Sequence, residues 1–473
     1  MLREDSVWRC GKHEISLVRP RIMGILNVTP DSFSDGDGKL DQKAAVVKGL
    51  DMLDQGADII DIGGESTRPG ATPVDEQEEA RRVIPVVRSL VATGAPISID
   101  TRHPEVARMC VRLGCSIVND VSGFTDPDMV AVAAETSCGC VVICGREAKG
   151  NSSRRSVVLD NAHTPMRPVA SNRRFTLPEE APIMREVMGF LGDQARALMR
   201  AGVAHDRICI DPGAGFDKDT DKDVVIQRNT KKLESMGYAL MQAVSRKRYV
   251  GDIAGVDEPV ERDAATIGQT IWAVESGARV LRVHNVGEVA QAVNSYWSVA
   301  KKDPRRGFVS LGSNVGDRLG NLTRAVKLIN DLPLTCVVAA SHAYETEPAY
   351  GIETAVANAV VEIRTELAPM ILIERLLDVE NALGRERDST KPGFGPRTID
   401  CDLCWVEGEE HYGARLRLPH PHLGERDYVL VPMEDLMHDP VRFLAHAGVP
   451  VLPVEERVGH VVAELGVLEW ETL

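Results

Sequence analysis

The chain has 473 residues, 43% of them hydrophobic and 26% charged, and a formal net charge of −15 at pH 7. This length exceeds what one ordinary hydrophobic core supports, so two or three domains are expected. The acidic balance argues against a surface that binds nucleic acid or an anionic membrane. The start, MLREDSVWRC, lacks an apolar core segment, and no run of about 18 apolar residues occurs, which predicts a cytoplasmic protein.

The aromatic and cysteine contents further narrow the structural class of protein that the sequence can form. Only 4% of the residues are aromatic, which suits an α/β architecture better than an all-β one. The 10 cysteines are scattered through mostly apolar contexts, so we expect reduced core thiols and no disulfide framework. Cys401 and Cys404 have C-x-x-C spacing, but alternation along a strand would turn their sulfurs to opposite faces, so a zinc site is not expected.

Through residue 300, short apolar runs alternate with amphipathic stretches such as QKAAVVKGLDMLDQGA. This alternation predicts βα units and a parallel sheet. The apolar runs are IMGILN, ADIIDIGGE, PISID, SIVND, CVVICG, RICID, LMQAVSRK and RVLRVH. Eight units in about 280 residues fit a (β/α)8 TIM barrel. A doubly wound sheet is the alternative, but the G-x-G-x-x-G turn that would follow its first strand is missing.

Polar residues stand at or near the ends of these runs, and the active site of a TIM barrel lies at the C-terminal ends of its strands. Any one of them alone could be a helix N-cap or a satisfied loop group. Together they predict a ring of functional side chains at one mouth: Asn27, Asp61, Asp100, Asn119, Asp211, Lys247, Arg282 and His284. Loops 27–38 and 63–73, rich in Gly, Ser and Pro, are suited to close over a ligand. The basic stretch 146–182 is expected to be a disordered or a lid-like insertion, and its lack of periodicity favours disorder.

The segment KKDPRRG, residues 301–307, is a charged linker and the expected domain boundary. It separates a barrel domain over residues 1–300 from a second domain over residues 308–473. Beyond the linker the pattern is strand-helix-strand-strand-helix-strand. This order predicts an α+β ferredoxin-like sandwich, in which helices pack against an antiparallel sheet.

The last strand of that pattern, in GPRTIDCDLCWV, carries two carboxylates, Asp400 and Asp402. Carboxylates about 7 Å apart on one strand face repel each other unless a cation lies between them. The alternative is a solvated edge strand without a function. Arg397 and the arginines upstream instead favour an anionic ligand that is bound through a metal ion. Alternation places Thr398, Asp400, Asp402 and Cys404 on this face, and Ile399, Cys401, Leu403 and Trp405 on the core face.

Several long motifs carry a resemblance to known families. The first domain resembles dihydropteroate synthase through ILNVTPDSFSDG, DIGGESTRPGA, SIDT, IVNDVSG, DPGAGF, VSRK and RVHNV. The second is similar to hydroxymethyl-dihydropterin pyrophosphokinase through SLGSNVGDR, YETEP, VENALGRER, FGPRTIDCDL and LPHPHLGERDYVL. Long ordered matches are more specific than single short motifs. The resemblance implies a bifunctional enzyme of folate biosynthesis: one half transfers pyrophosphate from ATP to 6-hydroxymethyl-7,8-dihydropterin, and the other condenses the ester with p-aminobenzoate to 7,8-dihydropteroate.

In the kinase half, the resemblance implies that Asp400 and Asp402 bind Mg²⁺, which prefers hard oxygen ligands. The pterin would lie between Phe394 and Tyr428, with Asn358 at its polar edge, and Val356 stands where the family usually has an aromatic residue. The implied contacts of the co-substrate ATP are Arg385, Arg387, Arg397, His420, Arg426 and Glu380, of which Arg385 and Arg397 would be catalytic.

In the barrel half, the resemblance implies a pterin site made of Asp100, Asn119, Asp211 and Lys247. Arg282 and His284 would stabilise the departing pyrophosphate and form the catalytic set with Lys247, while Asn27 would bind Mg²⁺. The implied p-aminobenzoate and pyrophosphate contacts are Phe33, Asp35, Thr67, Arg68, Pro69, Ser245, Arg282 and His284. Two departures from the family pattern are VVICGRE after the fifth strand, in place of a Met-His-Met-type sequence, and Asp217, where glycine or alanine usually precedes the lysine.

The expected partners are small-molecule substrates and a second copy of the chain, bound through the barrel as a homodimer, with neither nucleic acid nor membrane. One alternative keeps a single half catalytic and makes the other a pterin-binding or dimerising scaffold. Another, a pterin-dependent methyltransferase barrel, would share Asp100, Asn119 and Asp211, but it does not account for TPDSFSDG, STRPG or the kinase half.

Overall fold

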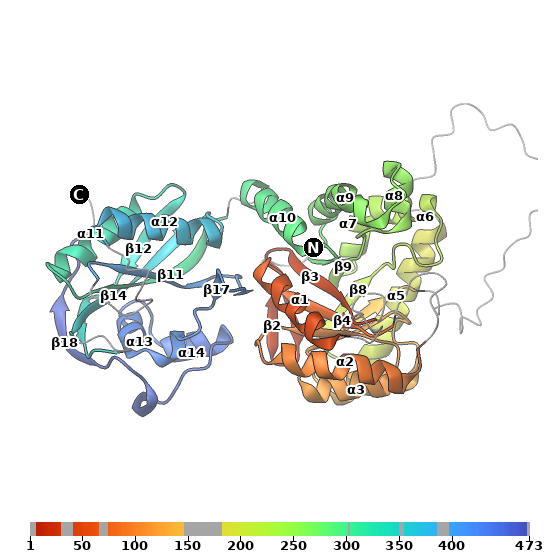
Figure 1. Cartoon of the computed structure of the whole chain (residues 1–473), viewed down its shortest axis with the longest axis horizontal. Coiled ribbons are helices and arrows are strands. Elements are labelled where there is room, and N and C mark those ends of the chain that lie inside the picture. Colours follow the sequence, from red (N-terminus) through yellow and green to blue (C-terminus); the bar gives the residue numbers. More distant parts are fainter. Residues whose placement is uncertain are drawn as a thin grey trace, which may run out of the picture. The chain divides into compact units, whose positions relative to one another are not determined.

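A computed structural model describes residues 6–29, 41–65, 74–145, 182–300, 303–349, 354–385 and 397–470. The chain folds into two compact units, residues 1–293 and 294–473 (Figure 1). Within the described ranges, none of the helices combines the length and the apolar character needed to cross a bilayer.

The first unit is a closed barrel of eight parallel strands, as predicted, and not a doubly wound sheet. Each predicted apolar run overlaps one strand. The closed order runs from β10 through β3 and on to β9. The strands are β3 (Arg21–Asn27), β4 (Ile59–Gly63), β5 (Ile97–Asp100), β6 (Ile117–Asp120), β7 (Gly139–Ile143), β8 (Ile208–Asp211), β9 (Ala239–Gln242) and β10 (Val280–Val283).

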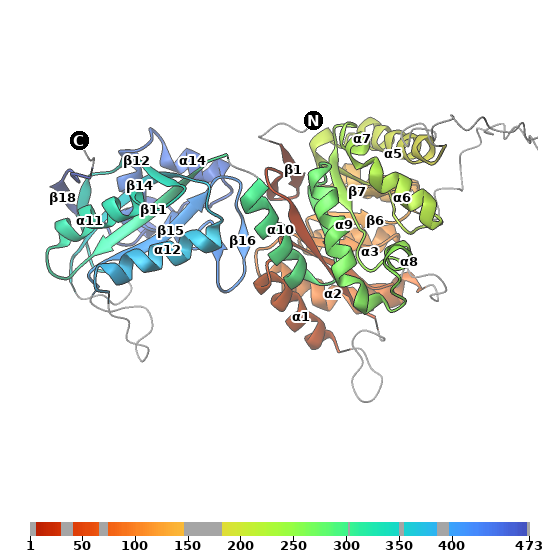
Figure 2. The same cartoon turned by 90° about the horizontal axis from the view of Figure 1, so that it is seen from above.

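Helices surround the barrel, and their starts follow capping rules (Figure 2). The side chains of Asp41 and Asp75 accept hydrogen bonds from backbone N–H groups in the first turns of α1 and α2. The helices are α1 (Gln42–Asp54), α2 (Glu76–Val91), α3 (Pro104–Leu113), α4 (Pro127–Glu135), α5 (Pro182–Arg200), α6 (Thr220–Arg228), α7 (Thr230–Glu234), α8 (Arg248–Ala254), α9 (Asp263–Glu275) and α10 (Val286–Ala300), with the short η3 (His205–Arg207) and η4 (Pro259–Arg262).

A hairpin that the sequence pattern did not predict covers the N-terminal end of the barrel. It consists of β1 (Val7–Cys10) and β2 (His13–Ser16). Trp8 is fully buried, and its indole N–H donates to the carbonyl of Arg207 at 3.0 Å. The hairpin packs against apolar side chains near the starts of the strands, such as Ile59 and Ile117. The opposite, C-terminal mouth is therefore the end that remains available to a ligand.

The second unit is a sandwich with helices on both faces of a mainly antiparallel sheet, whose strand order is β15-β11-β14-β13-β18, with β12 also paired to β14. Helices α11 and α12 share one core with the sheet, and α13 and α14 share the other (Figure 1). The strands are β11 (Arg305–Ser313), β12 (Thr335–Ala340), β13 (Ala343–Thr346), β14 (Val356–Thr365), β15 (Asp400–Val406) and β18 (Val461–Gly466); the helices are α11 (Arg318–Asn330), α12 (Pro369–Ala382), α13 (Asp427–Glu434) and α14 (Pro440–His446).

The predicted order of elements through β15 is confirmed, with two differences of detail. The stretch predicted as one strand over residues 335–346 is divided into β12 and β13, which pair with different parts of β14. Strand β11 begins at Arg305, so the last residues of the predicted linker 301–307 belong to the sheet. Elements beyond β15 were not predicted: they include the small hairpin of β16 (His411–Tyr412) and β17 (Arg417–Leu418), η5 (Leu423–Glu425) and η6 (Val454–Glu456).

The predicted alternation of β15 is wrong at its end. Asp400 and Asp402 are half-buried and share a face, while Ile399, Cys401 and Leu403 lie in the core beneath α11 and α12. Trp405 instead joins the opposite core, where it packs edge-on against Phe443. The cause is a bulge: Phe308 pairs with Trp405, but the next residue of β11 pairs with Leu403.

Asp58 neutralises two buried arginines at the start of the barrel. Its Oδ1 lies 2.5 Å from Arg19 Nη2 and 3.3 Å from Arg21 Nη1, and its Oδ2 accepts the N–H of Ile22 at 2.8 Å. All three charged side chains are buried. Loss of the carboxylate would leave cations that cannot reach water.

We expect Asp58→Ala to lower the free energy of unfolding of the first unit by about 3–5 kcal/mol, because it removes one partner of a buried ion cluster. Denaturant unfolding of the full chain measures this. Asp51→Ala, which removes an exposed carboxylate on α1, is the control and should change it by less than about 0.5 kcal/mol. Equal effects of the two substitutions would contradict this account of Asp58.

Two candidate active sites

At the C-terminal mouth of the barrel, one arginine connects three strands. Arg282 of β10 donates from Nε to Asp61 Oδ2 on β4 at 2.6 Å and from Nη2 to Asp100 Oδ2 on β5 at 2.5 Å. Asn119 of β6 donates from Nδ2 to the same Asp61 oxygen at 3.0 Å. Strand ends far apart in the sequence therefore bring these predicted residues into one connected cluster.

The cluster has more negative than positive charge near Arg282. Burial raises the pKa of Asp100 to about 7; Arg282 opposes this rise, and Asp61 adds to it. Burial alone would lower the pKa of Arg282, but Asp61 and Asp100 hold it above its ordinary value. Two carboxylates share one guanidinium, so the arginine remains a cation while Asp100 is only partly compensated.

Asp211 and Lys247 complete the floor of this mouth. Burial raises the pKa of Asp211, although its Oδ1 accepts the N–H of Gly213 at 2.7 Å. Burial and Arg282 lower the pKa of Lys247 to about 8. The Lys247 ammonium lies 4.2 Å from the centre of the Phe216 ring, a cation–π distance.

Among the residues that the structure describes, three buried oxygen atoms at this mouth have no hydrogen-bond partner. They are Asp61 Oδ1, Asn119 Oδ1 and Asp211 Oδ2. A buried acceptor without a donor is costly, and such atoms in a site point to donors supplied by a ligand. A flat heterocycle with several N–H groups along one edge has the chemistry that satisfies them.

The remaining described residues of the predicted ring lie at strands β3, β9 and β10. Ser245 Oγ lies 3.0 Å from His284 Nδ1 and accepts the backbone N–H of His284 at 3.2 Å. Asn27 is the last residue of β3, on the strand between β4 and β10. Five predicted contacts lie outside the described residues, namely Phe33, Asp35, Thr67, Arg68 and Pro69.

The departure at Asp217 is visible in the backbone. Asp217 has φ +48°, the left-handed region where glycine is favoured. The following Lys218 donates from Nζ to the carbonyls of Cys144, Gly213 and Phe216 at 2.8–3.0 Å. Lys218 thus fastens the loop after β8 to the end of β7.

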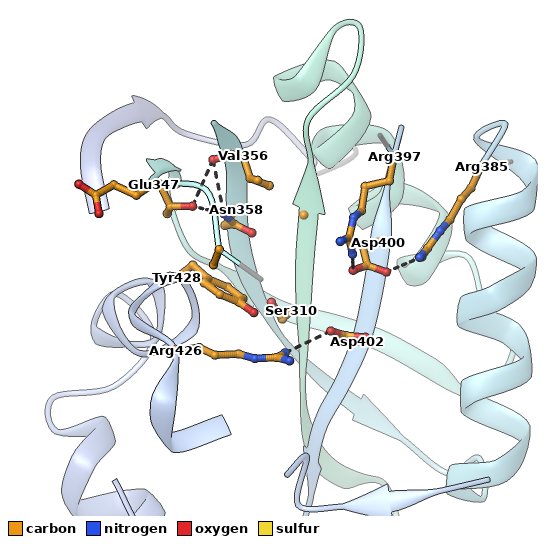
Figure 3. A pocket seen from close by; sticks show the side chains of 13 residues that line it. Ser310, Glu347, Val356, Asn358, Arg385, Arg397, Asp400, Asp402, Arg426 and Tyr428 are labelled. Carbon is orange, nitrogen blue, oxygen red and sulfur yellow. Dashed lines mark hydrogen bonds and ion pairs between the residues drawn. The ribbon is translucent and has the colours of Figure 1, made fainter. Parts of the chain in front are cut away.

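The second site is a cavity of about 270 Å³ in the second unit (Figure 3). Ser310, Gly312, Asp402 and Asp400 pair across β11 and β15, so their exposed sides form one floor. The lining residues are Ser310, Gly312, Thr346, Glu347, Ala349, Val356, Asn358, Arg385, Arg397, Asp400, Asp402, Arg426 and Tyr428.

Arginines neutralise both carboxylates of β15. Arg385 and Arg397 each form an ion pair with Asp400, and Arg426 Nη1 lies 3.4 Å from Asp402 Oδ2 (Figure 3). Burial raises the pKa of Asp402 to about 6, with a further contribution from Asp400 that the arginines oppose. The pocket therefore concentrates three cations beside two acids, a set suited to a polyanion accompanied by a metal ion.

Two predicted contacts lie behind the pocket wall. Glu380 is buried; its Oε1 accepts from Cys401 N at 2.7 Å and from Arg385 Nη1 at 2.5 Å, so it orients that arginine. His420 donates its backbone N–H to the carbonyl of Cys404 at 2.8 Å. Burial and Arg426 lower the pKa of His420 to about 4, which keeps the ring neutral at pH 7. Arg387 and Phe394 lie outside the described residues.

The other end of the pocket holds none of the arginines and is partly aromatic, and its one carboxylate belongs to the exposed Glu347 (Figure 3). Asn358 donates from Nδ2 to Thr346 Oγ1 at 2.7 Å, and Tyr428 of α13 lines the opposite side (Figure 3). Sequence reasoning gave no role to Thr346 or Ser310 here, or to Phe216 in the barrel, and it placed Asp61 at the barrel mouth without assigning it a ligand. Their motifs YETEP, SLGSN, DIGGE and DPGAGF were recognised, but nothing in a motif says which side chain turns into a cavity.

Comparison with known families matches both units. The family described as pterin binding enzyme matches residues 23–284, and the 7,8-dihydro-6-hydroxymethylpterin-pyrophosphokinase family matches residues 308–438. Among curated relatives, dihydropteroate synthase of Staphylococcus haemolyticus is 34% identical over 283 residues, which cover 59% of this chain and 95% of the relative. That of Bacillus subtilis is 37% identical over 274 residues, covering 57% and 85%.

Solved structures give the same result for the barrel. A dihydropteroate synthase of Xanthomonas albilineans, with 4-aminobenzoic acid, is 36% identical with a TM-score of 0.54, covering 62% of this chain and 99% of that one. The same enzyme in complex with 7,8-dihydropteroate is 34% identical with a TM-score of 0.51, covering 61% and 96%.

Burial of Asp100 at the barrel mouth predicts that the stability of the first unit depends on pH. Folded Asp100 has a pKa of about 7, whereas an unfolded aspartate has about 3.9. The folded state therefore binds the extra proton between about pH 4 and pH 7, and this contribution to stability is lost as the pH rises through that window. Asp100→Asn removes the titrating carboxyl group and with it this pH-dependent contribution.

We expect the free energy of unfolding of the wild-type first unit to fall relative to that of Asp100→Asn as the pH rises from 4.5 to 7, by at most about 1.4 kcal/mol per pH unit. Denaturant unfolding at several pH values measures the difference. Asp128→Asn, at an exposed position on α4, should run parallel to the wild type. If the plot of unfolding free energy against pH for Asp100→Asn were also parallel to that of the wild type, Asp100 would not be the cause of the pH dependence.

Proposed function

The chain belongs to the pterin-binding enzyme family, and we propose that it catalyses two consecutive steps of folate biosynthesis. The second unit pyrophosphorylates 6-hydroxymethyl-7,8-dihydropterin with ATP, and the first condenses the resulting ester with p-aminobenzoate to give 7,8-dihydropteroate. One observation carries this proposal: each unit matches its own family model and presents its own cluster of buried charges.

In the kinase reaction, the hydroxymethyl oxygen attacks the β-phosphorus of ATP, the bond from that phosphorus to the α,β-bridging oxygen breaks, and AMP leaves. The hydroxyl proton passes to solvent. Arg385, Arg397 and Arg426 line the pocket and can exchange their present carboxylate partners for phosphate oxygens, which planar guanidinium groups bind in pairs. Tyr428 and Asn358 lie at the opposite end, where an aromatic face and an amide suit a pterin.

Mg²⁺ fits the carboxylates of this pocket. Within the described ranges, no group of three His, Cys, Asp or Glu side chains is arranged to hold a metal ion alone. Mg²⁺ is commonly held by one or two carboxylates together with substrate phosphates, and Asp400 and Asp402 provide that pair. When bound, the ion would neutralise charge on the phosphates.

In the synthase reaction, the amine nitrogen of p-aminobenzoate attacks the methylene carbon of the ester, the carbon–oxygen bond breaks, and pyrophosphate and the amine proton leave. The unpaired oxygens of Asp61, Asn119 and Asp211 would accept from the pterin N–H groups. Arg282 and His284 would bind the departing anion, where stabilisation is worth most because charge develops there. Asn27 would contribute an oxygen to its Mg²⁺, and Ser245 a hydroxyl to p-aminobenzoate.

A single active half with the other as scaffold is not favoured, because neither unit lacks its charged cluster. A methyltransferase barrel leaves the second unit without a role. Association of two copies through the barrel, and a cytoplasmic location, stay predictions from the sequence. The decisive experiment is a coupled assay with hydroxymethyl-dihydropterin, ATP, Mg²⁺ and p-aminobenzoate in which AMP and dihydropteroate are quantified separately. Formation of neither product would overturn the proposal.

We expect Asp402→Ala to reduce AMP formation by at least about 100-fold, because a metal ligand in the pocket is lost. Dihydropteroate formation from added pyrophosphate ester should be unchanged in the same sample. Asp378→Ala, which removes an exposed carboxylate on α12, is the control and should keep both activities. Kinase activity that survives in Asp402→Ala at ordinary Mg²⁺ would remove the acidic pair from the mechanism.

For the barrel, we expect Arg282→Ala to lower dihydropteroate formation from the ester by about 100- to 1,000-fold, the usual effect of removing a preorganised donor to a developing anion. AMP formation should remain at the wild-type rate. Arg200→Ala, at an exposed position near the end of α5, controls for loss of an arginine. A change in KM alone, with kcat retained, would restrict Arg282 to ground-state binding.

A further inference from the structure

The turn after β9 holds an unusual backbone conformation between two site residues. Arg246 has φ +59°, in the left-handed region that a non-glycine residue adopts only when its surroundings enforce it. Ser245 precedes it and contacts His284; Lys247 follows it and lies over Phe216. The conformation of Arg246 thus sets the directions of two neighbouring side chains in the barrel mouth.

The surroundings that enforce this conformation come from η4 and α9. Asp263 Oδ1 accepts from Arg246 Nε at 2.7 Å, and Asp263 Oδ2 accepts from Arg246 Nη2 at 2.6 Å, a paired geometry. Thr266 Oγ1 accepts the backbone N–H of Arg246 at 3.1 Å. Arg262 donates from Nη1 to the carbonyls of Arg246 and Lys247 at 3.1 and 3.3 Å.

Asp263 also fixes the segment that carries the histidine. Its Oδ2 accepts from Asn285 Nδ2 at 2.9 Å, and Asn285 directly follows His284. One carboxylate therefore connects the Ser245–Lys247 turn to the end of β10. The side-chain hydrogen bond from Arg246 lowers the pKa of Asp263, so the group stays ionised at neutral pH.

We propose that Asp263 is a positioning residue for the synthase reaction: it holds Arg246 in the left-handed conformation and thereby aims Ser245 and Lys247 into the site. This inference rests on the proposed synthase function of the barrel. Asp263 lies behind the turn and bonds to Arg246 and Asn285, so it acts on substrate through those residues. Without its carboxylate, the strained turn is free to relax to an ordinary conformation and carry Ser245 away from His284.

A pair of substitutions at Arg246 separates the effect of the backbone conformation from the effect of losing the guanidinium group. Both Arg246→Gly and Arg246→Ala remove the guanidinium, but only glycine adopts φ +59° without strain. We expect Arg246→Ala to lose about tenfold more kcat/KM for p-aminobenzoate than Arg246→Gly, because the left-handed turn is costly for alanine. An ion pair that served only overall stability would give the two variants the same kcat/KM.

A double-mutant cycle then tests Asp263 itself. In the wild-type background, Asp263→Ala should lower kcat/KM for p-aminobenzoate by about 10- to 100-fold. In the Arg246→Gly background, the same substitution should cause a loss at least about threefold smaller, because glycine needs no clamp and only the bond to Asn285 is then removed. AMP formation by the second unit of the full-length chain, measured in the same samples, should be unchanged in every variant.

Each outcome decides between the two claims. Wild-type protein that makes AMP but no dihydropteroate would refute the proposed synthase function, and this inference with it. With an active wild type, equal kcat/KM for Arg246→Gly and Arg246→Ala, or an equal loss from Asp263→Ala in both backgrounds, overturns the positioning role alone. Rescue by glycine, together with a cycle that is not additive, supports it.

Discussion

The buried arginines of both sites are paired with carboxylates, and both sites depend on this neutralisation of charge. A charge removed from water without a partner costs several kcal/mol. In the barrel, Asp61 and Asp100 pair with Arg282. In the second unit, Asp400 pairs with Arg385 and Arg397. The carboxylates therefore stabilise the folded protein, whatever part they take in the proposed reactions.

The two sites differ in what the carboxylates do once a ligand enters. In the pocket of the second unit, Asp400 and Asp402 lie on the floor. Under the proposed function, a metal ion that comes with the nucleotide would take the place of the arginines, which would then be available to phosphate. In the barrel, Asp61 is fully buried and holds Asn119 as well as Arg282. Under the proposed function, Asp61 would remain paired with Arg282 there, so the arginine would bind the leaving group with part of its charge already compensated.

Much of this arrangement could be predicted from local sequence patterns. The periodicity of hydrophobic residues and the polar residues at strand ends can both be recognised within short segments of the chain. The eight barrel strands and the residues at their C-terminal ends are cases of that kind. Other features depend on contacts between distant segments. The bulge that moves Trp405 to the other core requires the partner strand, and burial of Trp8 beneath the barrel requires the completed barrel. Glu380 is a further case. The sequence predicts it as a contact of ATP, but its hydrogen bond from the N–H of Cys401 places it behind Arg385.

Strained backbone conformations occur in a part of the barrel that the hydrophobic pattern of the sequence did not predict. Among the described residues, non-glycine positions with positive φ are Phe124, Asp217, Arg246 and Leu334, and the first three follow β6, β8 and β9 at the C-terminal mouth. Each such conformation is unfavourable by itself, so it persists only where other bonds impose it. Asp120 Oδ2 accepts the N–H of Phe124 at 2.8 Å, as Asp263 holds the side chain of Arg246. The parallel direction of the strands brings the site residues to one end of the barrel. Carboxylates at or beyond the strand ends, such as Asp120 and Asp263, then hold the turns that carry them.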